Sequence, residues 1–347
     1  MPVQNRWEHL QLNWRQPLAC RAPMTSTPSS GSIITVTAPR DGLTISERAS
    51  ARTRAVAPSR GFFATSFRRF ARDRLSVVAL TGFLMITLVS VAAPWIADHI
   101  LHTSPDAFMR TPDGRIATLQ PPGPGYPLGT DDLGRDNLTR LIFAGRVSLL
   151  IGFLVALISI FIGTTLGLIA GFYGGRVDDL VNAIVQFMFN IPTLFVLIIL
   201  SVFFTPNVLT LALIFGLLGW AGTTRQVRGE VLSVRQRDYV DAARVMGASD
   251  ARILTQHVLP NLVSLVMVVA GLDIAGAILG ESALSFLGFG VPVPLSSWGN
   301  MLSGSQETFR SAPWLVYPPG AMIFITVLCV FLLSDGLRDA FDPRLKE

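Results

Sequence analysis

Residues 180–224 read LVNAIVQFMFNIPTLFVLIILSVFFTPNVLTLALIFGLLGWAGTT and contain no charged side chain. A helix needs about 20 apolar residues to cross the hydrocarbon core of a bilayer, so this stretch is too long for one crossing. Thr205-Pro206-Asn207 is a turn-forming tripeptide within it. The stretch is therefore predicted to form two membrane spans, one on each side of this turn.

Apolar stretches of span length also lie on both sides of that pair. They cover residues 75–96, 147–173, 258–286 and 312–333. The sequence thus predicts an all-α integral membrane protein with six transmembrane helices and both termini on one side. We expect a disordered tail over 1–60, a first span with its following loop over 61–140, a five-helix core over 141–337, and a short tail over 338–347.

The composition excludes several classes of protein. Half of the residues are hydrophobic and 15% are charged, whereas soluble domains carry about 25% charged residues. Lys346 is the only lysine, so the chain has no P-loop, which needs a lysine to reach the nucleotide phosphates. The two cysteines are far apart in sequence and cannot build a Cys-rich metal site, and no catalytic constellation stands out. His99 and His102 are three residues apart, for which an exposed interfacial loop is favoured over a metal site. Any ATP hydrolysis therefore belongs to another polypeptide.

The arginine positions predict the orientation of the spans. Cytoplasmic segments of membrane proteins carry an excess of Lys and Arg. Five arginines lie within residues 60–74, before the first span, and six lie within residues 225–252, between the fourth and fifth spans. The 98–145 loop carries four arginines, but six aspartates offset them. Both termini are therefore predicted to be cytoplasmic.

The segment between the fourth and fifth spans has the pattern of a surface helix that ends in a turn. Gly247 is placed as glycine is placed after a helix C-terminus, and Ser249 can cap a second short helix. Roughly 35 residues are many for a simple connector, which favours a docking site for another protein. One face of the first helix is predicted from residues at i, i+3, i+4 and i+7: Tyr239, Ala242, Ala243 and Met246.

This segment resembles the Glu-Ala-Ala loop of ABC importer permeases. Asp241-Ala242-Ala243-x-x-x-Gly247, followed by Leu259-Pro260, matches that pattern, with Asp241 in place of the glutamate and His257 in place of an isoleucine. Further stretches resemble the C-type subunit of the dipeptide/oligopeptide/nickel permease family: LGTDDLGRD at 128–136, RVSLLIG at 146–152, ESALSFLG at 281–288, SWGNM at 297–301 and DGLRDAFDPR at 335–344. The resemblance covers roughly residues 65–347.

The resemblance implies the type I ABC importer permease fold, with cytoplasmic coupling helices in the loop 225–260. It implies no catalytic residue, cofactor or metal in this chain, with ATP and Mg on separate ATPase subunits. The implied partners are a second permease subunit, two ATPase subunits, an extracytoplasmic solute-binding protein and the lipid bilayer, without nucleic acid. The residues implied to contact the ATPase are Tyr239, Asp241, Ala242, Ala243, Met246, Gly247, Ala248 and Ser249.

The family also implies a location and a class of cargo. The location is the plasma (inner) membrane of a bacterium or archaeon, and di- and oligopeptides are the implied cargo, with nickel or another solute still open. The alternative from another class is an ion-coupled secondary carrier. Such a carrier needs an ion site near the midplane, for which Asp273 is the only candidate.

Two carboxylates, Asp273 and Glu281, fall within the fifth span. Charges at bilayer depth cost at least about 2.5 kcal/mol on insertion scales, so they usually face a bundle interior or a cavity. The two residues are eight positions apart, about 80° around a helix, and can share one broad face. Each is a candidate to line a transport pathway, or is a packing carboxylate bonded to a neighbouring helix. For Glu281, a position at the outer membrane–water interface is a further alternative.

Two features precede or lie within the second span. Asp131, Asp132, Arg135 and Asp136 stand just before it, and the resemblance implies that they face the binding protein, although a capped lead-in to the helix explains them nearly as well. The small residues of GTTLGLIAG at 163–171 recur every fourth position, which permits close contact with another helix. We expect helix packing there and not ligand binding.

Overall fold

Helices make up the regular structure of the part of the chain that the computed structural model describes, residues 62–204 and 207–341. These residues belong to one unit, Arg60–Glu347, and the tail expected at 1–60 lies outside them. Between residues 108 and 136 the chain forms four isolated β-bridges and no strand. The predicted all-α class is confirmed.

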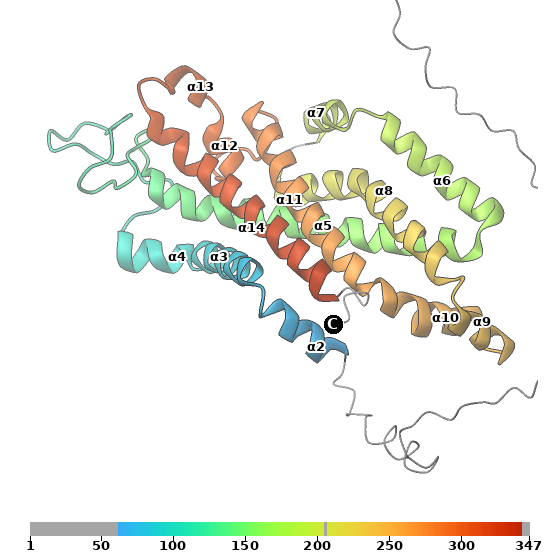
Figure 1. Cartoon of the computed structure of the whole chain (residues 1–347). Coiled ribbons are helices and arrows are strands. Elements are labelled where there is room, and N and C mark those ends of the chain that lie inside the picture. Colours follow the sequence, from blue (N-terminus) through green and yellow to red (C-terminus); the bar gives the residue numbers. More distant parts are fainter. Residues whose placement is uncertain (1–61, 205–206, 342–347) are drawn as a thin grey trace, which may run out of the picture. The chain divides into compact units, whose positions relative to one another are not determined.

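Five helical stretches are each long and apolar enough to cross a bilayer (Figure 1). They are α3 (Arg74–Val91), α5 (Asn137–Tyr173), α8 (Val208–Val234), Asp250–Phe286 and Pro313–Phe341. The fourth joins α10 (Asp250–Ile253), a π-helical turn (Leu254–Val258) and α11 (Leu259–Phe286), and the fifth joins a 3-10 turn (Pro313–Leu315) to α14 (Tyr317–Phe341). The shorter helices are α2 (Phe62–Phe70), α4 (Ala93–Ile96) with a π-helical turn (Ala97–Leu101), α9 (Asp238–Val245), α12 (Trp298–Leu302) and α13 (Ser305–Thr308).

The sixth candidate span is a broken helix pair. The stretch expected to form the third span, from residue 180, contains a bend that the sequence analysis did not predict: α6 (Gly175–Asn190) and α7 (Thr193–Phe203) meet at 81°. Pro192 has no backbone N–H and disfavours helical dihedrals at the preceding residue, and Ile191 is extended, with φ −86° and ψ 122°. The described residues thus contain five candidate spans, or six when the bent pair counts as one.

Glycines on α5 let α8 approach closely, as the small-residue spacing predicts. A Cβ atom on any of the three glycines would lie 2.5–2.8 Å from the Cβ of an α8 residue, closer than real side chains approach. The pairs are Gly163 with Thr223, Gly167 with Val227, and Gly171 with Val231. The two helices are in contact because these positions carry no side chain.

Alanine at Gly167 is expected to lower the free energy of unfolding by about 1–2 kcal/mol, since overpacking outweighs the gain in helix propensity. The added methyl group would meet Val227 and the carbonyl oxygen of Thr224 at 2.8–2.9 Å. Gly229→Ala on α8 is the matched control, because open space surrounds its Cβ position. Unfolding of the purified protein in a denaturing-detergent titration measures both, and equal stability of the two variants would contradict this packing.

Three spans extend about ten residues beyond their predicted ends. α5 begins at Asn137 where residue 147 was expected, α8 continues to Val234 and not to residue 224, and the helix through α11 begins at Asp250 and not at residue 258. Ten helical residues add about 15 Å. α14 likewise continues to Phe341, past the expected boundary at 337. The bundle therefore reaches well beyond its apolar part.

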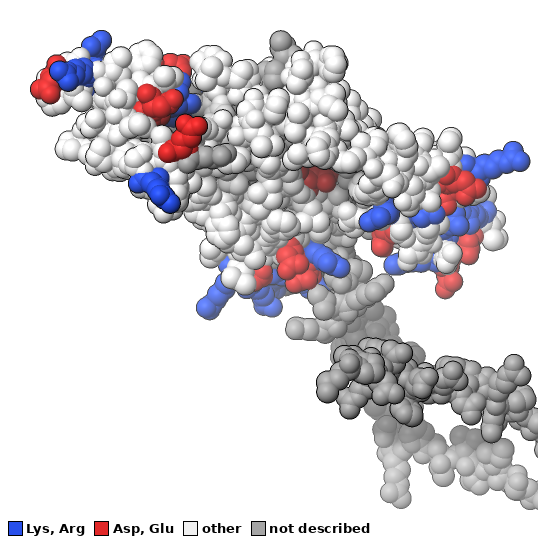
Figure 2. Space-filling view, turned by 90° about the horizontal axis from the view of Figure 1, so that it is seen from above, with Lys and Arg blue, Asp and Glu red and all other residues white. Residues whose placement is uncertain are grey.

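Charged side chains gather toward the two ends of this unit (Figure 2). One group lies over the 98–136 loop and its surroundings, and the other lies toward the end that carries α2 and α9, while the surface between is almost entirely uncharged (Figures 1 and 2). Exposed large hydrophobic residues are common on the long helices, such as Phe161 of α5 and Phe324 of α14. This distribution suits a chain whose middle faces lipid.

Candidate functional site

α9 is held against the ends of three long helices. Its buried residues Val240 and Ala243 join an apolar cluster with Phe172 of α5, Val231 of α8 and Leu262 of α11. A fully buried core residue packs against neighbours on every side, so α9 cannot shift without moving the ends of those helices. The short helix α9 is therefore packed rigidly against α5, α8 and α11 and projects from their ends, and is not a loose connector.

The opposite face of α9 is exposed and partly apolar. Met246 is 81% exposed, Val245 is 90% exposed and Tyr239 is 39% exposed, and Ala242 is exposed beside them. Isolated exposed apolar residues are ordinary, but a group of them on one short helix marks a contact surface. We call Tyr239, Ala242, Val245 and Met246 the α9 face.

The α9 face differs from the predicted one at two positions. Ala243 was expected on it, but Ala243 is only 2% exposed and faces the cluster described above. Val245 was not expected and is its most exposed member. The helical spacing predicted one stripe that contains both buried and exposed residues. A helix of eight residues has too few turns for the spacing to show where its buried face ends and its exposed face begins.

Gly247 ends α9 in a Schellman motif. Its φ is +80°, its N–H donates to the carbonyl oxygen of Arg244 at 2.9 Å, and the N–H of Ala248 donates to the carbonyl oxygen of Ala243 at 3.0 Å. The predicted glycine turn is confirmed. Ser249 occupies the N-cap position of α10, but its side chain makes no capping hydrogen bond.

The predicted second short helix is part of a longer one. α10 continues through the π-helical turn into α11, so the span does not begin at residue 258 as expected, and Pro260 lies within the continuous helix. The wider turn lies just before Pro260, whose ring nitrogen cannot donate to the residue four positions earlier. α9 is consequently joined to a continuous helix that runs through the bundle, and movement of α9 acts on that helix directly.

Arginines fix the neighbourhood of Asp241. Arg235 donates to the carbonyl oxygens of Gly171 at 2.8 Å and Phe172 at 3.3 Å, and so closes the C-terminus of α5. Arg244 lies over the Phe172 ring and forms an exposed ion pair with Asp241 at 3.3 Å. The Asp241 carboxylate is thus at the surface beside the α9 face and available to a partner.

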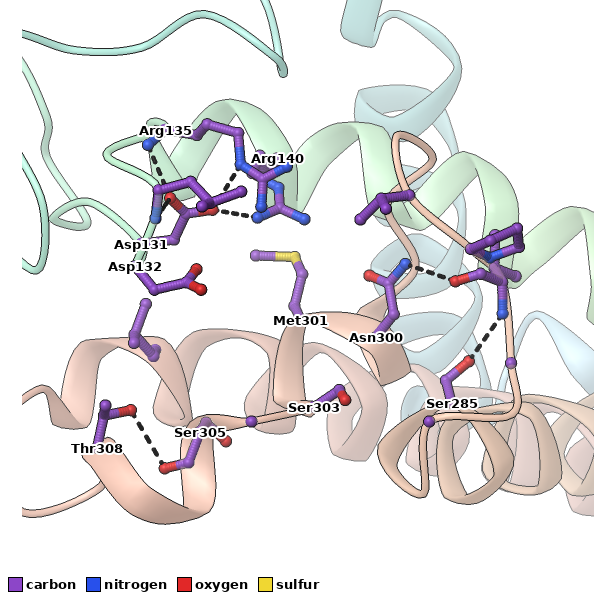
Figure 3. Close-up of a pocket in the computed structure, with 18 of the residues that line it drawn as sticks. Asp131, Asp132, Arg135, Arg140, Ser285, Asn300, Met301, Ser303, Ser305 and Thr308 are labelled. Carbon is purple, nitrogen blue, oxygen red and sulfur yellow. Dashed lines mark hydrogen bonds and ion pairs between the residues drawn. The ribbon is translucent and has the colours of Figure 1, made fainter. Parts of the chain in front are cut away.

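A second group of polar residues lies at the start of α5, at the opposite end of the bundle from α9 (Figure 1), and is drawn in Figure 3. Asp131 is buried and accepts from Arg135 at 2.8 Å and from Arg140 of α5. Asp136 is also buried and caps α5, accepting from the N–H of Thr139 at 2.8 Å. Of the four residues expected to face a binding protein, only Asp132 is exposed, because the other three hold the loop onto the start of α5.

This group borders an outer cavity of about 820 Å³ (Figure 3). Its walls come from the start of α5, the 288–293 segment, and α12 and α13 with the residues between them. Asp132 points into it, whereas Asp131 is already neutralised by its two arginines. Glu307 adds a further carboxylate to its lining. Arg140 is a member of this site that the sequence did not single out, because its charge stands close to a predicted span and its partner lies nine residues away.

Asp273 and Glu281 have different surroundings on α11. Glu281 is fully buried and accepts from the hydroxyls of Ser285 and Ser297 at 2.6 Å and of Ser148 at 3.3 Å. Asp273 lines an inner cavity of about 460 Å³, and the Thr223 hydroxyl of α8 donates to it at 3.0 Å. The two carboxylates therefore do not share one environment. Glu281 is bonded to residues of other segments, and Asp273 borders the inner cavity.

The chain resembles known transport proteins over most of its length. Residues 163–347 match the family described as "Binding-protein-dependent transport system inner membrane component". Residues 61–122 match the family described as "N-terminal TM domain of oligopeptide transport permease C". The chain belongs to the binding-protein-dependent ABC transport permeases. It is therefore a multi-pass inner membrane component that works with a binding protein and an ATPase, and is not itself the catalytic subunit.

Individual relatives support this assignment. The oligopeptide transport system permease protein OppC of Haemophilus influenzae is 37% identical over 80% of this chain and 87% of the relative. That of Bacillus subtilis is 34% identical over 80% and 88%. The dipeptide transport system permease protein DppC of Alkalihalophilus pseudofirmus is 36% identical over 81% and 90%. This permease is thus similar to C-type subunits across nearly their whole length.

Proposed function

We propose that this permease forms half of the translocation pathway of an ATP-driven importer that carries di- and oligopeptides. The observation that carries the proposal is the α9 face, which is exposed and partly apolar while its helix is anchored to α5, α8 and α11. A rigidly packed helix of this kind transmits the movement of a docked partner to the spans. The relatives named for oligopeptide and dipeptide transport support peptides as the cargo.

The proposed complex contains a second permease subunit, two ATPase subunits and an extracytoplasmic solute-binding protein. ATP and Mg bind to the ATPase subunits. The ATPase contacts the α9 face together with Asp241, while Gly247, Ala248 and Ser249 set the position of α9. Nickel or another solute remains the alternative cargo, because nothing in the α9 face depends on what is carried.

The proposed orientation places α9 and both termini in the cytoplasm of a bacterium or archaeon. α2 carries Arg68 and Arg69, and α2 and α9 lie toward the same end of the unit, away from the 98–136 loop (Figure 1). Cytoplasmic segments are the arginine-rich ones, which supports this assignment. The 98–136 loop and the outer cavity then face the binding protein, with Asp132 as the accessible carboxylate.

Reconstitution of the complete complex tests the proposed function. Proteoliposomes that contain both permeases and both ATPases, with the binding protein on the side of the 98–136 loop, are expected to accumulate a radiolabelled dipeptide only when ATP is supplied on the α9 side. Uptake driven by an ion gradient without ATP would instead identify a secondary carrier. The absence of peptide uptake together with ATP-driven uptake of nickel would overturn the proposed cargo.

A further inference from the structure

The inner cavity has one charged side chain in its lining. Val155 and Ser159 of α5, Leu194 and Leu197 of α7, Phe215 of α8 and Leu284 of α11 are among the residues around it, and Asp273 is the only ionisable one among the described residues that line it. Its volume of about 460 Å³ falls within the range of small-molecule sites, which span roughly 300–1,000 Å³. The cavity thus combines apolar walls with a single anion.

Asp273 has no cationic partner among the described residues. The ion pairs there join other residues, and only the hydroxyls of Thr223 and Ser159 support the Asp273 carboxylate. Glu281 lies about two turns further along the same helix and is a structural carboxylate by comparison. Three hydroxyls donate to it, and it is fully buried. Asp273 lacks that enclosure and faces space.

Glycines keep this space open. Four of them, Gly219, Gly222, Gly276 and Gly280, line the cavity from α8 and α11. A Cβ atom at Gly222 or Gly276 would meet no atom within 4 Å, so these glycines are not required by helix packing. A glycine in a helix interior makes the helix less stable than an alanine would. At these two positions the missing side chain leaves the cavity volume unfilled.

We propose that Asp273 receives the N-terminal ammonium group of a peptide as it passes through the inner cavity. This inference rests on the proposed function, because it names the part of the cargo that the permease recognises. An ammonium group has three donors, which Asp273 and the two hydroxyl oxygens can accept. The neighbouring apolar wall suits the first side chain of the peptide. Every unblocked peptide carries this ammonium group, so recognition does not depend on sequence.

An ion is a poorer occupant of the same cavity. A bound metal cation needs several oxygen ligands at once, whereas the side chains of the lining offer one carboxylate, on Asp273, and the hydroxyls of Ser159 and Thr193 within a largely apolar wall. No group of three or more metal-binding side chains occurs in the part of the chain that the structure describes. The carboxylate offsets the cost of bringing one organic cation into an apolar pathway.

Thiol labelling tests the preference for ammonium without requiring transport. Gly276→Cys is introduced into the complete complex with Cys20 and Cys329 replaced by serine. Its reaction rates are measured with an ammonium-bearing and a sulfonate-bearing methanethiosulfonate. The ratio of the two rates is expected to fall about tenfold when Asp273→Asn is added, since a charge-assisted contact is lost. An unchanged ratio would overturn the proposal, and the ratio is insensitive to the amount of folded protein.

Peptide uptake supplies the second readout. In proteoliposomes with the complete complex, Asp273→Asn is expected to lower ATP-driven uptake of an unblocked dipeptide by about tenfold or more. Gly276→Leu, which fills the cavity, should lower it similarly, whereas Gly320→Leu, at an equally open glycine on α14, should not. Normal uptake by Asp273→Asn would reject the inference. A wild-type complex that takes up no peptide would instead reject the proposed function.

Discussion

Arginine in place of Met246 is expected to reduce ATP-driven peptide uptake to the level measured without ATP. Met246 is 81% exposed at the end of α9, so the substitution removes no internal contact of the permease. A charged side chain within an apolar contact leaves an unpaired, desolvated charge, and well-packed buried residues carry most of the binding energy of an interface. The permease should therefore fold and insert normally but fail to hold its ATPase.

Uptake by the reconstituted complex measures this effect, and co-purification of the ATPase with the tagged permease locates its cause. Ser233→Arg is the matched control, because Ser233 is exposed on α8 near the same end but outside the α9 face. It should retain both uptake and the ATPase. Full uptake by Met246→Arg would show that the α9 face is not the docking surface.

Asparagine at Asp131 is expected to lower the free energy of unfolding by about 3–5 kcal/mol, the usual cost of removing one partner of a buried ion pair. The Asp131 carboxylate is shared by Arg135 and Arg140, and all three side chains are more than 90% buried. Asparagine has nearly the same shape but no charge. Two guanidinium groups would then stay buried without the carboxylate that they share.

Asp132→Asn provides the comparison at the neighbouring position. Asp132 is exposed, so its substitution should change stability by less than about 0.5 kcal/mol. Thermal unfolding of both variants in detergent measures the difference. Equal stability of the two would mean that the Asp131 ion pairs do not form in the protein. A loss of uptake by Asp132→Asn at normal stability would favour its proposed contact with the binding protein.

The apolar stretches were sufficient to predict the helical class and most of the spans, because the bilayer selects apolar residues over a full helix length. The ends were misplaced by about ten residues at α5, α8 and α11, since a helix can continue past the apolar region with polar residues that no longer mark it. The break at Pro192 was overlooked because a turn predicted at residues 205–207, partly outside the described residues, already divided the stretch.

Side-chain environments were harder to predict than helices. Glu281 and Asp273 look alike in sequence, but their different roles follow from Ser148, Ser297 and Thr223, which lie far away along the chain. In the same way, Asp131 reads as a surface charge until Arg140 is seen beside it. The residue spacing correctly predicted a helix at α9 and its end at Gly247. The burial of Ala243 could not be predicted in this way, because it depends on how α5, α8 and α11 pack around α9.

Site-directed cross-linking of α9 to the ATPase tests the central claim most directly. In the assembled complex, with Cys20 and Cys329 replaced by serine, a bifunctional thiol reagent is applied to Met246→Cys together with single cysteines placed at positions across the surface of the ATPase. We expect a cross-linked permease–ATPase product with Met246→Cys and none with Ala243→Cys, whose side chain is buried inside the permease. The absence of any product from Met246→Cys in a complex that still hydrolyses ATP would contradict docking through the α9 face.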